Sequence, residues 1–281
     1  MSDPVLWLDG ELVSAGDAGV SPFDHGLLVG DGVFETLRVY AGNPFAWTRH
    51  HRRLVRSAAG LGLTVPGSQE LRGAVDAVLA ANGLTDGRVR LTVTGGPSPL
   101  GSERGDGPPT VIVVAAPAVP WPPTVDVVIV PWSRNENGAV AGLKTTSYAE
   151  NVRALAYARE HDAGEAVFLN TRGELCEATG SNLFVVWDGV VRTPRADAGC
   201  LLGVTRALVL ELCAEHGMPA QEPVLGPESI RDADEAFLTS STREVQPIGR
   251  VDGRALPAAP GPTSEKLAGL LTELIARDPD P

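Results

Sequence analysis

Lysine is nearly absent from this sequence. The 281 residues contain two lysines, Lys144 and Lys266, against twenty-one arginines. Arginine stays protonated at any working pH, whereas a lysine can lose its proton and become an amine nucleophile. Lys144 lies in GAVAGLKTTSYAENV, and the small and apolar residues before it would disfavour a charged ammonium. Lys144 is therefore a candidate covalent catalyst, the alternative being a surface lysine at the end of a strand.

Clustered basic charge is also scarce. The formal net charge is -12, and the sequence pI is about 4.9. The arginines are dispersed except for RHHRR at 49–53. This balance argues against a general nucleic-acid binder, which would carry a basic patch or stripe. It does not exclude a small anionic substrate, because one pocket can still be positive.

Cysteines and long apolar runs are few. The three cysteines have spacings that match no common zinc pattern and no disulfide framework, so we expect buried thiols and no metal. The N-terminus lacks the basic and apolar regions of a signal peptide, and no apolar run approaches the roughly 18 residues of a membrane span. We expect a soluble cytoplasmic protein with no membrane partner.

Two halves of mixed helical and strand-like segments are separated by PAVPWPPTV, whose four prolines favour an extended connector. We predict an N-terminal α/β domain over 1–116, a linker over 117–125, and a C-terminal domain over 126–281 that carries the lysine. Asp9-Gly10 and Ala41–Asn43 are expected hairpin turns. Strands are expected at 88–96, 109–117, 125–132, 165–170, 181–191 and 234–241, and helices at 49–63, 67–84 (with Ser68 as N-cap and Gly83 as stop), 146–162, 204–217 and 264–278.

A reactive lysine suggests pyridoxal phosphate, which also needs a charged partner for its ring nitrogen and an anion site for its phosphate. Glu177, in GELCEATGSNLFVV, is expected where a strand breaks into a loop of small residues. It is either this ring-nitrogen partner or a solvent-facing turn residue.

Candidate phosphate ligands lie further along the chain. Gly203, Val204 and Thr205 come directly before a predicted helix, where free backbone N–H groups bind anions, although a simple helix cap explains them equally. LTSSTREV adds hydroxyl groups, and Arg53 adds a cation that can bind phosphate through charge-assisted hydrogen bonds.

The order of these motifs resembles the fold-type IV pyridoxal-phosphate enzymes, which include branched-chain aminotransferases, D-amino-acid transaminases and aminodeoxychorismate lyases. The resemblance covers nearly the whole chain, from DHGLLVGDGVFETLRVY through HHRRL, GLKTTSYAENV, GELCEATGSNLF and GVTRALVLE to TSSTREVQPI. It implies a two-domain α/β (α+β) fold with the active site in the interdomain cleft. It also implies pyridoxal 5′-phosphate as cofactor, a small-molecule substrate and a homodimer.

Residue roles follow from the same resemblance. Lys144 matches the lysine that binds the cofactor aldehyde and later moves the proton, and Glu177 matches the partner of the ring nitrogen. Tyr148 either reaches the cofactor or only packs beside it. The other matches are Arg53, Val204 and Thr205 for the phosphate, Ser241 and Thr242 near the phosphate and the substrate carboxylate, and Phe34 and Thr36 in the substrate pocket.

The activity within the family depends on the substrate pocket rather than on the fold. D-amino-acid transaminases carry an arginine and a histidine where this chain has VTGGPSPLG, which contains neither. Branched-chain aminotransferases usually have glycine where this chain has Thr36, and the pattern GDG-x-F-x-T resembles the lyases.

We therefore predict an aminodeoxychorismate lyase, which forms 4-aminobenzoate and pyruvate for folate biosynthesis. The alternative is an aminotransferase of branched-chain or D-amino acids. A third reading, a binding protein that has lost catalysis, is disfavoured because Lys144 and Glu177 are both present.

Overall fold

The computed structural model describes residues 3–281, which form two compact units. Unit 1 contains the chain up to Val119, the segment Leu143–Tyr148 and the last residues Pro279–Pro281; unit 2 contains Pro120–Gly142 and Ala149–Asp278. The chain thus leaves unit 1 inside the proline-rich segment where we expected a boundary. It returns for the six residues that carry Lys144, which therefore pack with the N-terminal unit.

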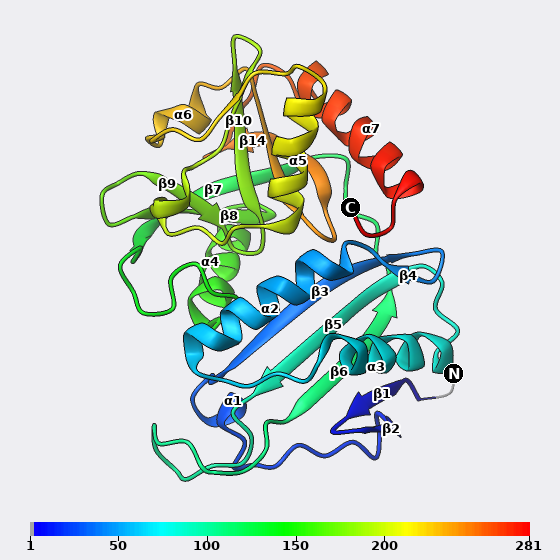
Figure 1. The fold of residues 1–281 in the computed structure, drawn as a ribbon. Coiled ribbons are helices and arrows are strands. Elements are labelled where there is room, and N and C mark those ends of the chain that lie inside the picture. The colour runs from blue at the N-terminus through cyan, green and yellow to red at the C-terminus, as the bar shows by residue number, and fades with distance from the viewer. Residues whose placement is uncertain (1–2) are drawn as a thin grey trace. The chain divides into compact units, whose positions relative to one another are not determined.

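Unit 1 is built on an antiparallel sheet with the strand order β2-β1-β6-β5-β3-β4 (Figure 1). Both expected hairpins are confirmed, and Asp9 and Gly10 have the positive φ angles of 48° and 107° that a tight turn requires. The strands are β1 (Val5–Leu8), β2 (Glu11–Ser14), β3 (Gly32–Tyr40), β4 (Asn43–Pro44), β5 (Gly87–Thr94) and β6 (Val111–Pro117).

Two helices, α2 (Trp47–Leu61) and α3 (Ser68–Ala81), pack against this sheet and bury the core of unit 1. A short helix, α1 (His25–Leu28), precedes β3. The predicted cap of α3 was wrong, because the N-cap is Gly67 and Ser68 is the first helical residue. The hydroxyl of Ser68 instead accepts a hydrogen bond of 3.1 Å from Trp47 Nε1.

Alternation along β3 sorts its side chains onto two faces. Val33, Leu37 and Val39 belong to the core shared with α2 and α3, and Glu35 lies on that same face. Phe34 and Thr36 point to the opposite face. A carboxylate is thereby placed among core residues, where it needs partners.

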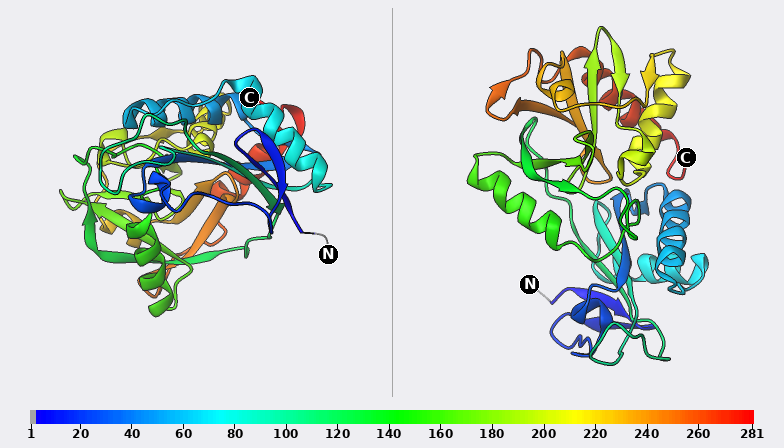
Figure 2. Two further views of the ribbon diagram at one scale, coloured as in Figure 1. Left: turned by 90° about the horizontal axis from the view of Figure 1, so that it is seen from below. Right: turned by 90° about the vertical axis from the view of Figure 1, so that its left-hand side faces the viewer.

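Unit 2, most of whose chain runs from green to red in Figure 2, is built on a mixed sheet. The strand order is β12-β11-β10-β13-β14-β7-β8-β9, and β7 pairs in parallel with both β8 and β14. The sequence analysis missed β9 and β14 as separate strands. The strands are β7 (Val125–Arg134), β8 (Glu165–Asn170), β9 (Leu175–Ala178), β10 (Asn182–Trp187), β11 (Val190–Arg192), β12 (Ala220–Gln221), β13 (Glu235–Ser240), β14 (Glu244–Val251) and β15 (Arg254–Ala255).

Helices pack on several strands of this sheet. Helix α4 (Ala149–Glu160) contacts β7 and β8, while α5 (Val204–Glu215) and α7 (Pro262–Arg277) contact each other and β13. A short helix, α6 (Glu228–Arg231), contributes Ile230 to a core cluster. In residues 3–281, no helix has the length and apolar character needed to cross a membrane.

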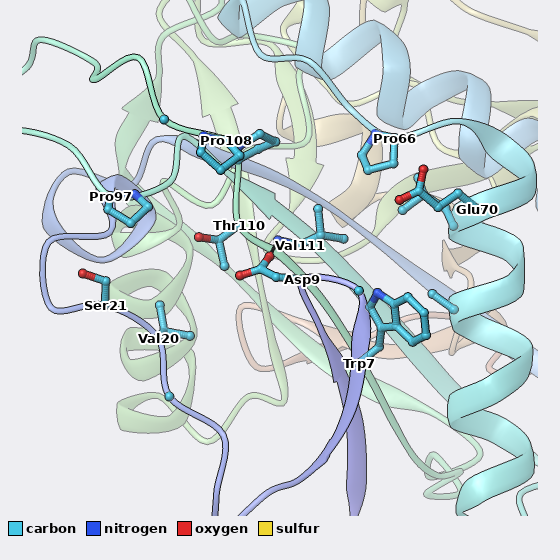
Figure 3. A pocket seen from close by; sticks show the side chains of 16 residues that line it. Trp7, Asp9, Val20, Ser21, Pro66, Glu70, Pro97, Pro108, Thr110 and Val111 are labelled. Carbon is cyan, nitrogen blue, oxygen red and sulfur yellow. Dashed lines mark hydrogen bonds between the residues drawn. The ribbon is translucent and has the colours of Figure 1, made fainter.

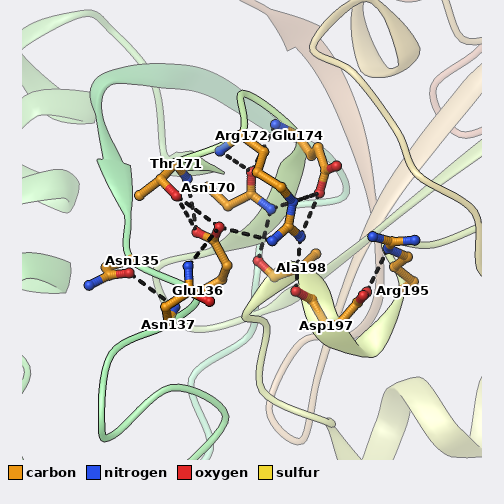
Figure 4. A network of polar contacts seen from close by, with 10 residues as sticks. All are labelled: Asn135, Glu136, Asn137, Asn170, Thr171, Arg172, Glu174, Arg195, Asp197 and Ala198. Atoms are coloured by element: carbon orange, nitrogen blue, oxygen red, sulfur yellow. Dashed lines mark hydrogen bonds and ion pairs between the residues drawn. The ribbon is translucent and has the colours of Figure 1, made fainter.

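The turn between β8 and β9 is held by a network of polar contacts around Glu136 (Figure 4). The Glu136 carboxylate accepts hydrogen bonds from the Thr171 N–H at 3.0 Å and from Arg172 Nη1 at 2.9 Å. These contacts, led by the backbone N–H of Thr171, lower the pKa of Glu136 to about 2. The network fixes the turn that we expected at NTRGE.

All three cysteines are buried and unbonded, as the sequence suggested. Burial raises the pKa of the Cys200 thiol to about 12 and that of Cys213 to about 11. These two thiols are therefore protonated at neutral pH.

Candidate active site

Lys144 is held in place through its backbone. Its carbonyl oxygen accepts a hydrogen bond of 3.1 Å from the N–H of Phe34, and Thr146 donates to Gly32 O at 2.8 Å. Thr145 forms a β-bridge with Val33 between these bonds. The segment thus extends the beginning of β3 by a short piece of strand. The N–H of Lys144 donates to the hydroxyl of Ser57, on α2, at 3.1 Å.

Three side chains, those of Lys144, Arg90 and Tyr148, contact the ring of Phe34. The Lys144 amine lies 4.4 Å from the ring centroid, and the Arg90 guanidinium carbon lies 3.7 Å from it. Tyr148 packs edge-on, with ring centroids 5.2 Å apart. Of the predicted substrate residues, Thr36 lies directly across from Arg90 in the β3–β5 ladder. A potential nucleophile and a second cation therefore meet on one aromatic surface.

Arg53, predicted to bind phosphate, is buried on α2 and paired with Glu35. Its Nε and Nη2 each donate a hydrogen bond of 2.7 Å to the Glu35 carboxylate. His50 Nδ1 donates to the same carboxylate at 2.7 Å. Glu35 and His50 were not predicted as site residues, although an acidic residue on the apolar face of a strand indicates a buried partner.

The charges in this cluster are set by mutual contacts. Burial alone would raise the pKa of the Glu35 carboxyl, but Arg53 and His50 hold that pKa well below its usual range. Burial lowers the pKa of His50, and the positive charges of Arg53 and Lys144 lower it further, against the opposing effect of Glu35. At neutral pH the cluster contains an ionised Glu35, a charged Arg53 and a neutral His50.

Glu177 lies near the end of β9 in unit 2, at the strand-to-loop break that the sequence predicted. Its Oε1 accepts a hydrogen bond of 2.8 Å from Arg134 Nη1, and its Oε2 accepts one of 2.9 Å from the Leu201 N–H. Arg134 is in turn bonded to Asn151 Oδ1 at 2.7 Å and stacks 4.0 Å from the centroid of Phe168. Glu177 is thus a fixed, buried carboxylate rather than a solvent-facing turn residue.

The N-terminus of α5 carries the predicted phosphate loop. Val204 is the first helical residue, Thr205 the second, and the N-cap Gly203 makes no side-chain cap bond. The first N–H groups of a helix have no acceptor within the helix, and its dipole favours an anion there. A side chain at position 203 would collide with Asn182 Oδ1, so the glycine keeps this backbone accessible.

Hydroxyl groups surround the same part of unit 2. Ser241 and Thr242 form the turn between β13 and β14. The buried hydroxyl oxygens of Ser181 and Thr239 have no hydrogen-bond partner among the described residues. Ser181 directly precedes Asn182, and Thr239 pairs with Asn182 between β10 and β13. Unpaired buried polar atoms are costly, so these positions fit a polar ligand.

The predicted residues therefore fall into two groups, each brought together within its own unit. Unit 1 holds Phe34, Thr36, Arg53, Lys144 and Tyr148. Unit 2 holds Glu177, Val204, Thr205, Ser241 and Thr242.

A separate cavity of about 640 Å³ in unit 1 is lined by residues such as Trp7, Asp9, Glu70 and Val111 and by none of the predicted site residues (Figure 3).

Comparisons with known proteins identify the family of this chain. The family model described as amino-transferase class IV matches residues 32–251, so the chain belongs to the class IV aminotransferases, which are pyridoxal-phosphate enzymes. The chain is 37% identical over 89% of its length, and 89% of the relative's, to a protein of Methanocaldococcus jannaschii provisionally named a branched-chain-amino-acid aminotransferase. It is 32% identical to the D-alanine aminotransferase of Listeria innocua, with 95% and 94% of the two chains covered.

Solved structures match the fold of this chain closely. The branched-chain aminotransferase of Thermoproteus uzoniensis with norvaline matches at a TM-score of 0.91 and 31% identity, covering 98% of this chain and 95% of that chain. A Legionella pneumophila protein provisionally described as a 4-amino-4-deoxychorismate lyase matches at 0.87 and 27%, covering 92% and 96%. The expected two-domain fold-type IV architecture is confirmed.

The residues present fit pyridoxal phosphate. Lys144 is an amine in contact with an aromatic ring, Glu177 is a buried carboxylate, and the N-terminus of α5 offers N–H donors for a phosphate. When bound, the cofactor supplies an electron sink for the bonds at the substrate's α-carbon.

The buried His50 generates a prediction about pH and stability. Its pKa in the folded protein lies below the ordinary value of 6.5, so the unfolded chain binds a proton more readily than the folded one. The stabilisation is fully present above pH 6.5 and is lost as the pH falls below it. The free energy of unfolding in urea should therefore decline between pH 7.5 and pH 5.5, and His50→Asn should reduce that decline.

The exposed His216 provides the control, since His216→Asn should leave the decline unchanged. An equal decline in the wild type and in His50→Asn would show that His50 is not the group responsible.

Proposed function

We propose that the protein is an aminotransferase that moves the amino group of a small or branched-chain L-amino acid to a 2-oxo acid. The supporting observation is the placement of Lys144 and Arg90 on the ring of Phe34, with the amine 4.4 Å and the guanidinium carbon 3.7 Å from its centroid. An amine and a guanidinium stacked on the same ring suit a substrate whose amino group and carboxylate must be held together.

In this proposal both groups of residues bind the same cofactor molecule. Lys144 binds its aldehyde and moves the proton at the substrate's α-carbon, and Glu177 accepts a hydrogen bond from the ring nitrogen and keeps it protonated. The phosphate is bound by Arg53, by Val204 and Thr205 at the N-terminus of α5, and by the Ser241–Thr242 turn. Phe34, Thr36 and Tyr148 line the substrate pocket.

The preference for L-amino acids is supported at the end of β5. Gly95 packs directly on the Asp31 carboxylate, and a side chain there would collide with it. Asp31 is itself fixed by Arg104, whose Nε and Nη2 each donate a hydrogen bond of 2.6 Å. A larger side chain is therefore excluded at position 95, and the nearby Arg104 is already engaged by Asp31.

An aminodeoxychorismate lyase is the second candidate, favoured by one observation. Thr36 is half-buried and lies opposite Arg90, so its hydroxyl is on the face of the sheet that carries the Phe34 ring. A hydroxyl beside the reacting carbon suits the proton transfers of pyruvate release.

We also propose that the protein acts as a homodimer. Leu27 on α1 is 69% exposed, and Phe23 and Val29 are exposed beside it in the sequence. Leu100, in the loop after β5, is 78% exposed, and this loop contacts the α1 segment through hydrogen bonds from the Ser98 N–H to Phe23 O and between His25 Nε2 and Gly101 O. Large apolar side chains gathered in this way mark interaction surfaces.

One assay separates the two activities. The purified holoprotein is incubated with L-leucine, L-valine, D-alanine or D-glutamate and a 2-oxo acid, and separately with aminodeoxychorismate and no oxo acid. We expect amino transfer from the L-amino acids only, and its complete loss in Lys144→Ala. Sustained formation of 4-aminobenzoate and pyruvate would instead establish the lyase, and turnover in Lys144→Ala would contradict both assignments.

Glu177→Gln tests the ring-nitrogen assignment. Glutamine occupies the same volume but cannot hold the ring proton, so the variant should retain the cofactor and lose on the order of 10²–10³-fold in kcat. Glu174→Gln, in the same hairpin, is the matched control and should leave kcat unchanged. A Glu177→Gln variant with wild-type kcat would remove this carboxylate from the chemistry.

Arg90→Gln tests the carboxylate-binding assignment. Loss of a charged hydrogen bond to the substrate should raise KM for the amino acid roughly 10- to 100-fold. Arg88, exposed two residues earlier on the same face of β5, provides the control Arg88→Gln, which should leave KM unchanged. If both variants raise KM equally, general electrostatic attraction rather than a specific contact is responsible.

A further inference from the structure

One face of helix α2 connects the Arg53 guanidinium to the Lys144 backbone. His50, Arg53 and Ser57 are spaced by three and four residues, which places them in a row on one side of the helix. All three are buried, with 2%, 8% and 0% of their surface exposed. A helix inside a core normally presents apolar residues in such a row, so these polar side chains need a specific reason to be there.

Glu35 binds the first two residues of this row, His50 and Arg53. Its two oxygens receive three hydrogen bonds of 2.7 Å, one from His50 Nδ1 and two from Arg53 Nε and Nη2. Glu35 itself is 2% exposed and comes from β3, the strand that packs against α2. With this burial and these partners, Glu35 is placed to act on Arg53 rather than on a ligand.

The last residue of the row, Ser57, binds the backbone of Lys144. Ser57 accepts the N–H of Lys144 at 3.1 Å, and Phe34, the residue directly before Glu35, donates its N–H to the Lys144 carbonyl at 3.1 Å. The dipeptide Phe34–Glu35 therefore touches both the lysine backbone and the arginine head group. Contacts with β3 and α2 therefore hold the Lys144 backbone, and β3 also holds the Arg53 head group.

The geometry of the fork restricts Arg53. A guanidinium is planar, and two parallel hydrogen bonds to one carboxylate fix the orientation of that plane. The fork to Glu35 uses the Nε and Nη2 atoms of Arg53. The His50 bond fixes the carboxylate in turn, because it restrains Glu35 from a second direction.

We propose that Glu35 and His50 are positioning residues that hold the Arg53 guanidinium in the orientation needed to bind the phosphate of the cofactor. This inference rests on the proposed function, in which Arg53 binds that phosphate. Neither residue touches the cofactor: Glu35 acts through Arg53, and His50 acts through Glu35. Their effect is therefore specific to the phosphate.

The test compares two ligands that differ only in that phosphate. The apoprotein is titrated with pyridoxal phosphate and with pyridoxal, and the two Kd values are followed by the visible absorption of the bound ligand. Glu35→Gln should raise Kd for pyridoxal phosphate about tenfold or more and leave Kd for pyridoxal nearly unchanged. Arg53→Met should show the same selectivity, and the exposed Glu70→Gln on α3 should change neither value.

His50 supplies a rescue experiment. His50→Leu removes the donor to Glu35 and should weaken pyridoxal phosphate selectively, whereas His50→Asn places an amide N–H close to the position of Nδ1 and should restore the affinity. The His50 variants also test the proposal if Glu35→Gln does not fold, since Glu35→Gln takes the negative charge of the carboxylate away from the buried Arg53.

The outcomes separate the inference from the proposed function. Equal weakening of both ligands would overturn the inference, because a loosened fold does not distinguish them. Selective weakening in Arg53→Met but not in the Glu35 and His50 variants would also overturn it while the phosphate role of Arg53 stands. If Arg53→Met is itself unselective, the assignment of Arg53 in the proposed function fails as well.

Discussion

The backbone pairing between Lys144 and the beginning of β3 is the constraint on which the rest of the site depends. Residues 143–148 belong to unit 1 although they lie far from it in the sequence, and the bonds from Phe34, Thr146 and Ser57 hold them there. These bonds fix the backbone of Lys144 and with it the direction in which its side chain leaves the chain. In the proposed function, this direction determines where the amine meets the cofactor.

Opposite charges are arranged differently in the two units. In unit 1 the buried Glu35 neutralises Arg53, and the neutral His50 adds no further positive charge near Lys144. In unit 2 the functional group is the carboxylate: Arg134 and the Leu201 N–H stabilise the negative charge of Glu177. Each cluster keeps a functional group in a defined charge state, which a cofactor enzyme requires of its protein.

Much of this organisation was predictable from local sequence. The two hairpins, the helices α2, α4, α5 and α7, and the position of Glu177 near the end of a strand all follow from periodicity and turn residues. Lys144 stood out because the chain otherwise uses arginine. The activity does not follow from local sequence, because the Thr36 pattern resembles the lyases while relatives that match most of the chain are named as aminotransferases.

The long-range partnerships were not predictable. The Glu35–Arg53 fork, the Arg90–Phe34 stack and the packing of residues 143–148 on unit 1 each join segments that are distant in the sequence. Local propensity contains no information about such partners. The mistaken cap at Ser68 has a similar origin, because Trp47 on another helix provides the contact for its hydroxyl.

The most direct test of the account uses the scarcity of lysine. The holoprotein is reduced with borohydride, which makes the bond between cofactor and lysine permanent, and the labelled peptide is then mapped by mass spectrometry. With two lysines in the chain, the result is unambiguous. The account predicts the pyridoxyl label on Lys144 and none on Lys266. A label on Lys266, or no label in a protein that binds the cofactor, would contradict it.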